Sequence, residues 1–163
     1  LNVPYESGVA FVREPDALRA AMPITAEYFP NGTGVRDPSD FTPELSRRAR
    51  GVEIWAALRA LGRAGIAEIV GRNCRQARRF ATRLSEAGFA ILNDVALNQV
   101  LVSFGDATRT RDVIARIQAD GTCWCGVTVW QGQTAMRISV SSWATTDADV
   151  ERSADAMIRI AKR

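Results

Sequence analysis

The stretch Met136-Arg137-Ile138-Ser139-Val140-Ser141, followed closely by Thr146-Asp147-Ala148-Asp149-Val150, decides the fold class of this chain. Apolar and polar residues alternate in the first part, which predicts a strand because successive side chains of a strand point to opposite faces. Thr146 with Asp149 three positions later predicts a helix start, a capping box with aspartate in place of the usual glutamate. A strand therefore leads into a final helix.

Strands and helices are also predicted in the residues before this stretch, from Gly88 onward. The apolar positions that carry the pattern are Phe89 to Leu92, Val100, Val102, Phe104, Val113, Ile114, Ile117, Val127 and Val129. Together with the strand at 136–141 and the helix from Thr146, they predict the order strand, strand, helix, strand, strand and helix. Elements interspersed in this way indicate an α+β domain, with helices on one face of a mainly antiparallel sheet.

Longer helices precede this domain. Pro43-Glu44 opens a predicted helix, Gly62 and Gly65 bracket a break, and a second predicted helix ends with Gly88 as its C-terminal cap. Further upstream, Pro15 begins a short predicted helix through about Ala21.

The stretch 22–42 is rich in proline and glycine, and it predicts a long irregular loop. We therefore expect three regions: 1–42, connecting helices at 43–87, and the small α+β domain at 88–163.

Composition excludes several classes of protein. The chain has 163 residues and a formal charge of +3, without a dense basic run, so we expect no nucleic-acid partner. We also expect no membrane partner, because no apolar stretch is long enough to span a bilayer. Three cysteines without a disulfide pattern, Cys74, Cys123 and Cys125, favour a reducing, cytoplasmic setting and a role as apolar fillers.

The chain is poor in the usual catalytic groups. It contains no histidine, which excludes a Ser-His-Asp or Cys-His arrangement built from these residues alone, and we expect no metal site. Its single lysine, Lys162, stands next to the C-terminus, a poor place for an amine that must be desolvated to react.

Three motifs, in order along the chain, carry a resemblance to a known family. They are Leu1-Asn2-Val3-Pro4-Tyr5-Glu6-Ser7-Gly8, the run Glu44-Leu45-Ser46-Arg47-Arg48-Ala49-Arg50 with Trp55 downstream, and the stretches 136–141 and 145–150. Together they resemble group II pyridoxal-phosphate-dependent amino-acid decarboxylases, the group of the aromatic-amino-acid and glutamate enzymes. Glu6, where the family usually has aspartate, and Ala49, where phenylalanine is common, depart from the pattern.

The resemblance implies the C-terminal portion of a fold-type I enzyme. Residues 1–42 would be the tail of the large cofactor domain, including a mobile loop, and residues 88–163 would be the small α+β domain. Most of the large cofactor domain would be missing from this chain. The complete enzyme would be a cytoplasmic homodimeric carboxy-lyase that releases carbon dioxide and an amine from an amino acid. Its pyridoxal 5'-phosphate would be anchored by a lysine upstream of Leu1, in a His-Lys-Trp run, and this chain alone would be inactive.

Two alternatives remain open at this point: another fold-type I lyase or transferase, and a non-catalytic α+β binding or dimerisation module. The side-chain specificity is also open among aromatic, acidic and small amino acids.

Three residues are candidates for the site by the same resemblance. Tyr28 is the catalytic candidate, on a loop that closes over the site, where it would protonate the substrate α-carbon after carbon dioxide leaves. Arg137 is the substrate-binding candidate, because a guanidinium on a strand suits a carboxylate. Ser46 is the cofactor-binding candidate, at a loop-to-helix junction near the cofactor phosphate of the neighbouring subunit.

Each of these residues also has an ordinary structural interpretation. Tyr28 would be a surface tyrosine, and Ser46 would be a first-turn serine. Arg137 would form a surface ion pair or hold the small domain in place. Arg47, Arg48 and Arg50 are interpreted as a solvated or subunit-facing surface. Trp124, Trp130 and Trp143 are interpreted as core or interface aromatics.

Overall fold

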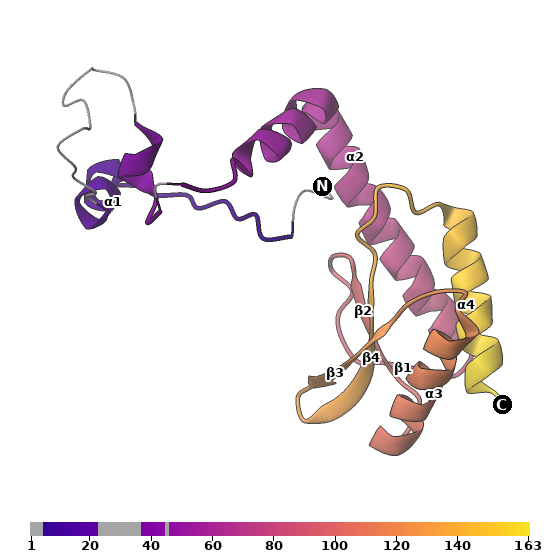
Figure 1. Ribbon diagram of the computed structural model, residues 1–163. Coiled ribbons are helices and arrows are strands. Elements are labelled where there is room, and N and C mark those ends of the chain that lie inside the picture. Colours follow the sequence, from indigo (N-terminus) through magenta and orange to yellow (C-terminus); the bar gives the residue numbers. More distant parts are fainter. Residues whose placement is uncertain (1–4, 23–36, 45) are drawn as a thin grey trace. The chain divides into compact units, whose positions relative to one another are not determined.

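The computed structural model describes residues 5–22, 37–44 and 46–163 (Figure 1). The contacts within the chain divide it into two compact units. One reaches up to Trp55, and the other is built from Ala56–Arg163. The three regions expected at 1–42, 43–87 and 88–163 remain a prediction.

The unit that ends at Trp55 contains the short helices α1 (Pro15–Ala21) and η1 (Pro38–Phe41). α1 confirms the helix predicted from Pro15, which occupies a first-turn position where its missing N–H is not needed. Arg19 joins the two helices, because its Nη2 donates to Asp40 Oδ2 at 3.1 Å. Of the predicted loop at 22–42, residues 23–36 lie outside the described residues.

α2 (Gly51–Glu86) connects the two units, and its start differs from the prediction. The described residues of the stretch 43–50 are not helical, so the helix predicted from Pro43-Glu44 is wrong in its start. The predicted break is confirmed at Gly62, whose backbone has φ 61° and ψ −175°. A side chain disfavours such a positive φ, which explains glycine at the kink.

The end of α2 is confirmed at Gly88, which has φ 95°. The Phe89 N–H donates to the Leu84 carbonyl at 3.0 Å and the Gly88 N–H donates to the Ser85 carbonyl at 2.9 Å. This is a Schellman motif, which satisfies carbonyls that the end of a helix leaves without partners.

A four-stranded antiparallel sheet forms the centre of the unit Ala56–Arg163. Its strands are β1 (Ala90–Ile91), β2 (Gln99–Ser103), β3 (Gly126–Trp130) and β4 (Gln133–Ser139), in the spatial order β1-β2-β4-β3. Val100 lies opposite Ile138, and Val102 lies opposite Met136. Because directly opposed residues share a face, these four side chains form one apolar face of the sheet.

Three helices cover that face (Figure 1). They are the C-terminal part of α2, α3 (Ala107–Asp120) and α4 (Asp147–Ala161). Together with the four sheet residues, they contribute the main members of one buried cluster: Ala77, Phe80, Leu84, Val113, Ile114, Ile117, Val150, Ala154, Met157 and Ile160. The predicted α+β arrangement, with helices on one face of an antiparallel sheet, is confirmed.

Three tryptophans of this unit lie outside the core. Trp124, Trp130 and Trp143 are 76%, 43% and 65% exposed, so they are not core residues, and the interface interpretation remains a prediction. Cys74 and Cys125 are buried and free, as expected of apolar fillers, and burial raises the pKa of the Cys125 thiol to about 12. None of the helices in the described ranges has the length and apolar character required to cross a membrane.

Candidate functional site

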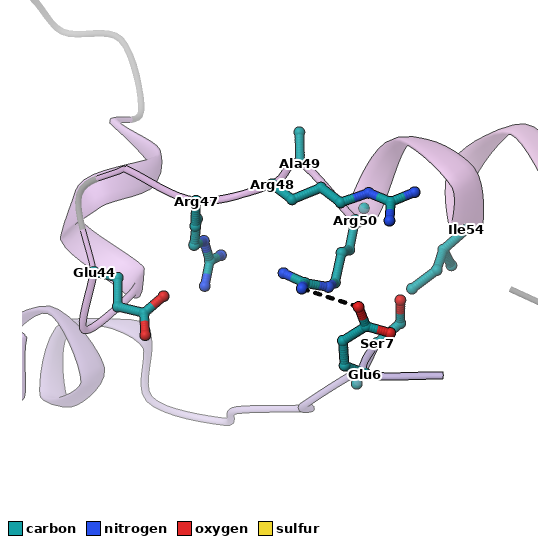
Figure 2. Close-up of a pocket in the computed structure, with 10 residues that line it drawn as sticks. Glu6, Ser7, Glu44, Arg47, Arg48, Ala49, Arg50 and Ile54 are labelled. Carbon is teal, nitrogen blue, oxygen red and sulfur yellow. Dashed lines mark hydrogen bonds and ion pairs between the residues drawn. The ribbon is translucent and has the colours of Figure 1, made fainter. Parts of the chain in front are cut away.

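A hollow of about 410 Å³ lies within the unit that ends at Trp55 (Figure 2). Two separate segments, one near Ser7 and one leading into α2, form its walls. Its lining consists of Glu6, Ser7, Gly8, Glu44, Arg47, Arg48, Ala49, Arg50, Gly51 and Ile54. A volume of this size accommodates a small organic molecule.

Two ion pairs fix the walls of this hollow. Arg50 Nη2 donates to Glu6 Oε1 at 3.1 Å, which ties the first segment to the second. Arg48 Nη2 donates to Glu53 Oε1 at 2.6 Å. The pKa of the Glu6 carboxyl is lowered, first by a hydrogen bond from its own backbone N–H and then by Arg50. Glu6 therefore remains a carboxylate, the form that binds the guanidinium.

The arginine segment does not have the structure that the sequence predicts. Ser46 lies in a bend and is exposed, and the helix starts only at Gly51. Ser46 therefore does not begin a helix, and the first helical N–H groups belong to residues near Gly51. The contact of Arg50 with Glu6 is a tertiary contact of the kind that overrides local helix propensity. A role for Ser46 at the cofactor remains a prediction.

Arg137 lies on β4, on the face of the sheet opposite the helices. It is directly opposed by Leu101 on β2 and by Gly126 on β3, and its side chain is exposed. Gly126 has no side chain, so no cross-strand side chain pairs with Arg137 from β3. Within the described part of the chain, Arg137 forms no ion pair or hydrogen bond through its side chain, so the surface ion pair considered as its alternative role is not found there.

The three predicted site residues are not gathered in one described site. Tyr28 lies outside the described residues. Ser46 belongs to the unit that ends at Trp55, and Arg137 belongs to the other unit. The described residues also hold no cluster of cysteine, aspartate or glutamate suited to a metal ion.

The sequence did not predict that Glu6 and the arginine segment form one structure. It indicates one solvated or subunit-facing surface at Arg47, Arg48 and Arg50, whereas Arg48 and Arg50 are held by carboxylates. The available signal was weak: Glu6 is 44 positions away from Arg50, and no local spacing rule relates them. Only the tertiary fold brings the two segments together.

Comparisons with known proteins identify the family. Residues 1–105 match the family described as "Pyridoxal-dependent decarboxylase conserved domain", and the chain belongs to this family. The family's cofactor is pyridoxal phosphate. The chain is also 26% identical to histidine decarboxylase of Drosophila melanogaster over 155 residues, which are 92% of this chain and 18% of that protein.

Solved structures share the fold. Oryza sativa TDC with PLP and tryptamine matches with a TM-score of 0.85 and 19% identity, over 93% of this chain and 34% of that chain. Catharanthus roseus tryptophan decarboxylase in complex with L-tryptophan matches with a TM-score of 0.78 and 18% identity, over the same shares. The chain therefore spans about a third of these proteins. The expected fold, part of a pyridoxal-phosphate decarboxylase, is confirmed.

The described residues fit one part of the cofactor. The arginines of the hollow suit the negative charge of its phosphate group. Two buried atoms of the hollow that can donate hydrogen bonds, Ser7 Oγ and Arg50 Nε, have no hydrogen-bond partner. The aldehyde of pyridoxal phosphate requires a lysine, and Lys162 is exposed at the end of α4. This chain therefore does not supply a suitable anchoring amine among its described residues.

Proposed function

We propose that this chain is the C-terminal part of a pyridoxal-phosphate-dependent L-amino-acid decarboxylase. The complete polypeptide would remove the α-carboxyl group as carbon dioxide and release an amine. The observation that carries the proposal is the family match at residues 1–105, supported by fold similarity over 93% of the chain. The exposed position of Lys162, the single lysine of this chain, agrees with an anchoring lysine outside it, which we place upstream of Leu1.

The bound cofactor supplies an electron sink that makes loss of carbon dioxide possible. The protein has to orient the substrate and deliver a proton. Arg137 would hold the substrate carboxylate region, since a strand fixes its guanidinium more rigidly than a loop does. Tight pairing to the leaving carboxylate would stabilise the ground state, so orientation is the proposed role. Ser46 would lie near the cofactor phosphate.

The proposed substrate class is aromatic or heteroaromatic L-amino acids. It rests on two similar proteins, whose names refer to histidine and to tryptophan. Homodimerisation and a cytoplasmic location belong to the same proposal. The chain alone would be inactive, because the anchoring amine and much of the substrate pocket would lie elsewhere.

The complete polypeptide tests the proposal directly. It should absorb visible light when loaded with pyridoxal phosphate, and it should release carbon dioxide and the matching amine from one of a panel of aromatic, acidic and small amino acids. Absence of a chromophore, together with the lack of a His-Lys-Trp run before Leu1, would contradict it and favour a binding or dimerisation module.

A second candidate function is another reaction on the same fold. Rhodiola rosea 4-hydroxyphenylacetaldehyde synthase matches this chain with a TM-score of 0.75 and 19% identity, and its name denotes an aldehyde product. Mass spectrometry of the products separates the two candidates, because an aldehyde in place of the amine identifies the second.

Tyr28 provides the residue-level test of the reaction. Replacement by phenylalanine removes the phenolic proton while retaining the ring. If Tyr28 protonates the α-carbon, Tyr28→Phe in the complete enzyme should lower amine formation by about 100-fold or divert the reaction to other products. Tyr5→Phe is the matched control, as Tyr5 is fully exposed. Unchanged turnover and product would remove Tyr28 from the mechanism.

A further inference from the structure

Two of the three arginines that line the hollow already have carboxylate partners. Arg50 pairs with Glu6 at 3.1 Å, and Arg48 pairs with Glu53 at 2.6 Å. These pairs hold the two guanidinium groups in place, and they also neutralise much of their charge. Neither arginine is therefore the best ligand for a further anion.

Arg47 differs from its neighbours. Its side chain is exposed, and it has no ion pair or hydrogen bond with any residue in the described parts of the chain. In Figure 2 the side chains of Arg47 and Arg50 extend to the same side of the segment that carries them. The lining holds three arginines and two glutamates, Glu6 and Glu44, and the partner of Arg48, Glu53, balances the third positive charge. Arg47 is the arginine of this group that has no ion pair among the described residues.

The wall of the hollow also contains unused hydrogen-bonding capacity. Ser7 Oγ and Arg50 Nε are buried atoms without a partner, although most buried polar atoms in proteins are hydrogen-bonded. A hydroxyl and a guanidinium N–H are both donors, and an anionic oxygen can accept from each of them. Donors without partners and the guanidinium of Arg47 thus line one space.

We propose that this hollow binds a small oxyanion, a carboxylate or a phosphate group, with Arg47 as its principal cationic ligand. The planar guanidinium fork matches two oxygens of either group. The ion pair between Arg50 and Glu6 holds the opposite wall, so the site is formed before the anion arrives. This binding does not depend on decarboxylase activity. The anion belongs either to the cofactor or to a separate molecule.

Calorimetry on the complete polypeptide tests the site, with inorganic phosphate and acetate as probes. Each probe is titrated into protein stripped of pyridoxal phosphate and into protein saturated with it. Arg47→Gln should weaken binding of at least one probe by about tenfold or more, the loss expected for a charge-assisted contact. Arg47→Lys keeps the charge without the fork, so it should retain part of the affinity, more for phosphate than for acetate.

Arg13→Gln is the matched control. Arg13 is exposed in the same unit and does not line the hollow, so this variant should bind like the wild type. Binding that depends on Arg47 in both forms indicates a separate anion. The same dependence in the stripped form alone indicates the cofactor phosphate. Equal affinity of Arg47→Gln and wild type, equal losses in Arg47→Gln and Arg13→Gln, or no saturable binding to the wild type would overturn the proposal.

Discussion

At the scale of single residues, the environment of Arg137 follows from strand register. Its neighbours across the sheet are Leu101 and Gly126, neither of which carries a charge. Among the described residues, no side chain forms an ion pair or a hydrogen bond with this guanidinium, and it is therefore available to a carboxylate from outside this sheet. The apolar residues on either side of it in the strand, Met136 and Ile138, are buried and fix the backbone of β4.

Arg137→Lys should raise the KM for the amino acid about tenfold in the complete enzyme, with a smaller change in kcat. Lysine keeps the charge and loses the bidentate fork, so an orienting contact weakens while the chemistry persists. Steady-state kinetics measure both constants. Arg78→Lys, at an exposed position of α2, is the control and should behave like the wild type. Unaltered KM and kcat in Arg137→Lys would leave Arg137 as an ordinary surface residue.

The sequence revealed individual site residues less well than it revealed elements. Arg137 could be placed on a strand because alternation is a local signal. The pairing of Arg50 with Glu6 could not be foreseen, since it depends on two distant segments meeting. Pro43-Glu44 resembles a helix start and predicts that Ser46 lies in a first helical turn, whereas the helix begins at Gly51. Local patterns do not report such tertiary contacts.

At the scale of elements, helix ends with their own capping groups were predictable. Thr146 and Asp149 form the expected capping box: the Asp149 N–H donates to Thr146 Oγ1 at 3.2 Å, and the Thr146 N–H donates to Asp149 Oδ2 at 2.9 Å. The end of α2 at Gly88 was predictable for the same reason. The start of α2 was not, because the residue before Gly51 is Arg50, and arginine is not among the residues that usually cap the start of a helix.

Thr146→Ala should lower the free energy of unfolding by about 1 kcal/mol, the usual cost of losing an N-cap. The substitution removes the acceptor for the Asp149 N–H, and α4 contributes Val150, Ala154 and Met157 to the core. Urea unfolding of the 163-residue chain, followed by circular dichroism, measures the change. Thr108→Ala, on the exposed surface of α3, is the control and should be close to neutral. Equal stability of Thr146→Ala and wild type would show that the box contributes nothing.

At the scale of the whole molecule, the unit Ala56–Arg163 has an ionic link in addition to its apolar core. Glu151 on α4 accepts hydrogen bonds from Arg79 and Arg83 on α2, and Arg83 also bonds Asp155. The pKa of Glu151 is lowered, first by the hydrogen bond from Arg79 and then by the charges of both arginines. The link thus joins two helices that are more than 60 positions apart in sequence.

This link should make the stability of the unit depend on pH. Because the folded-state pKa of Glu151 is below its ordinary value of 4.5, the stabilisation is fully present above that value and is lost as the pH falls through the lower, folded-state pKa. Glu151→Gln cannot titrate, so its stability should be lower than that of the wild type at neutral pH and should fall less steeply below pH 4.5. Thermal unfolding of the 163-residue chain at a series of pH values measures both effects.

Glu68→Gln provides the comparison. Glu68 pairs with Arg75 inside α2, so its replacement leaves the contact between α2 and α4 intact. If Glu151→Gln followed the wild-type curve throughout, the two helices would be held by their apolar contacts alone, and the arginines of α2 would be surface charges without a structural role.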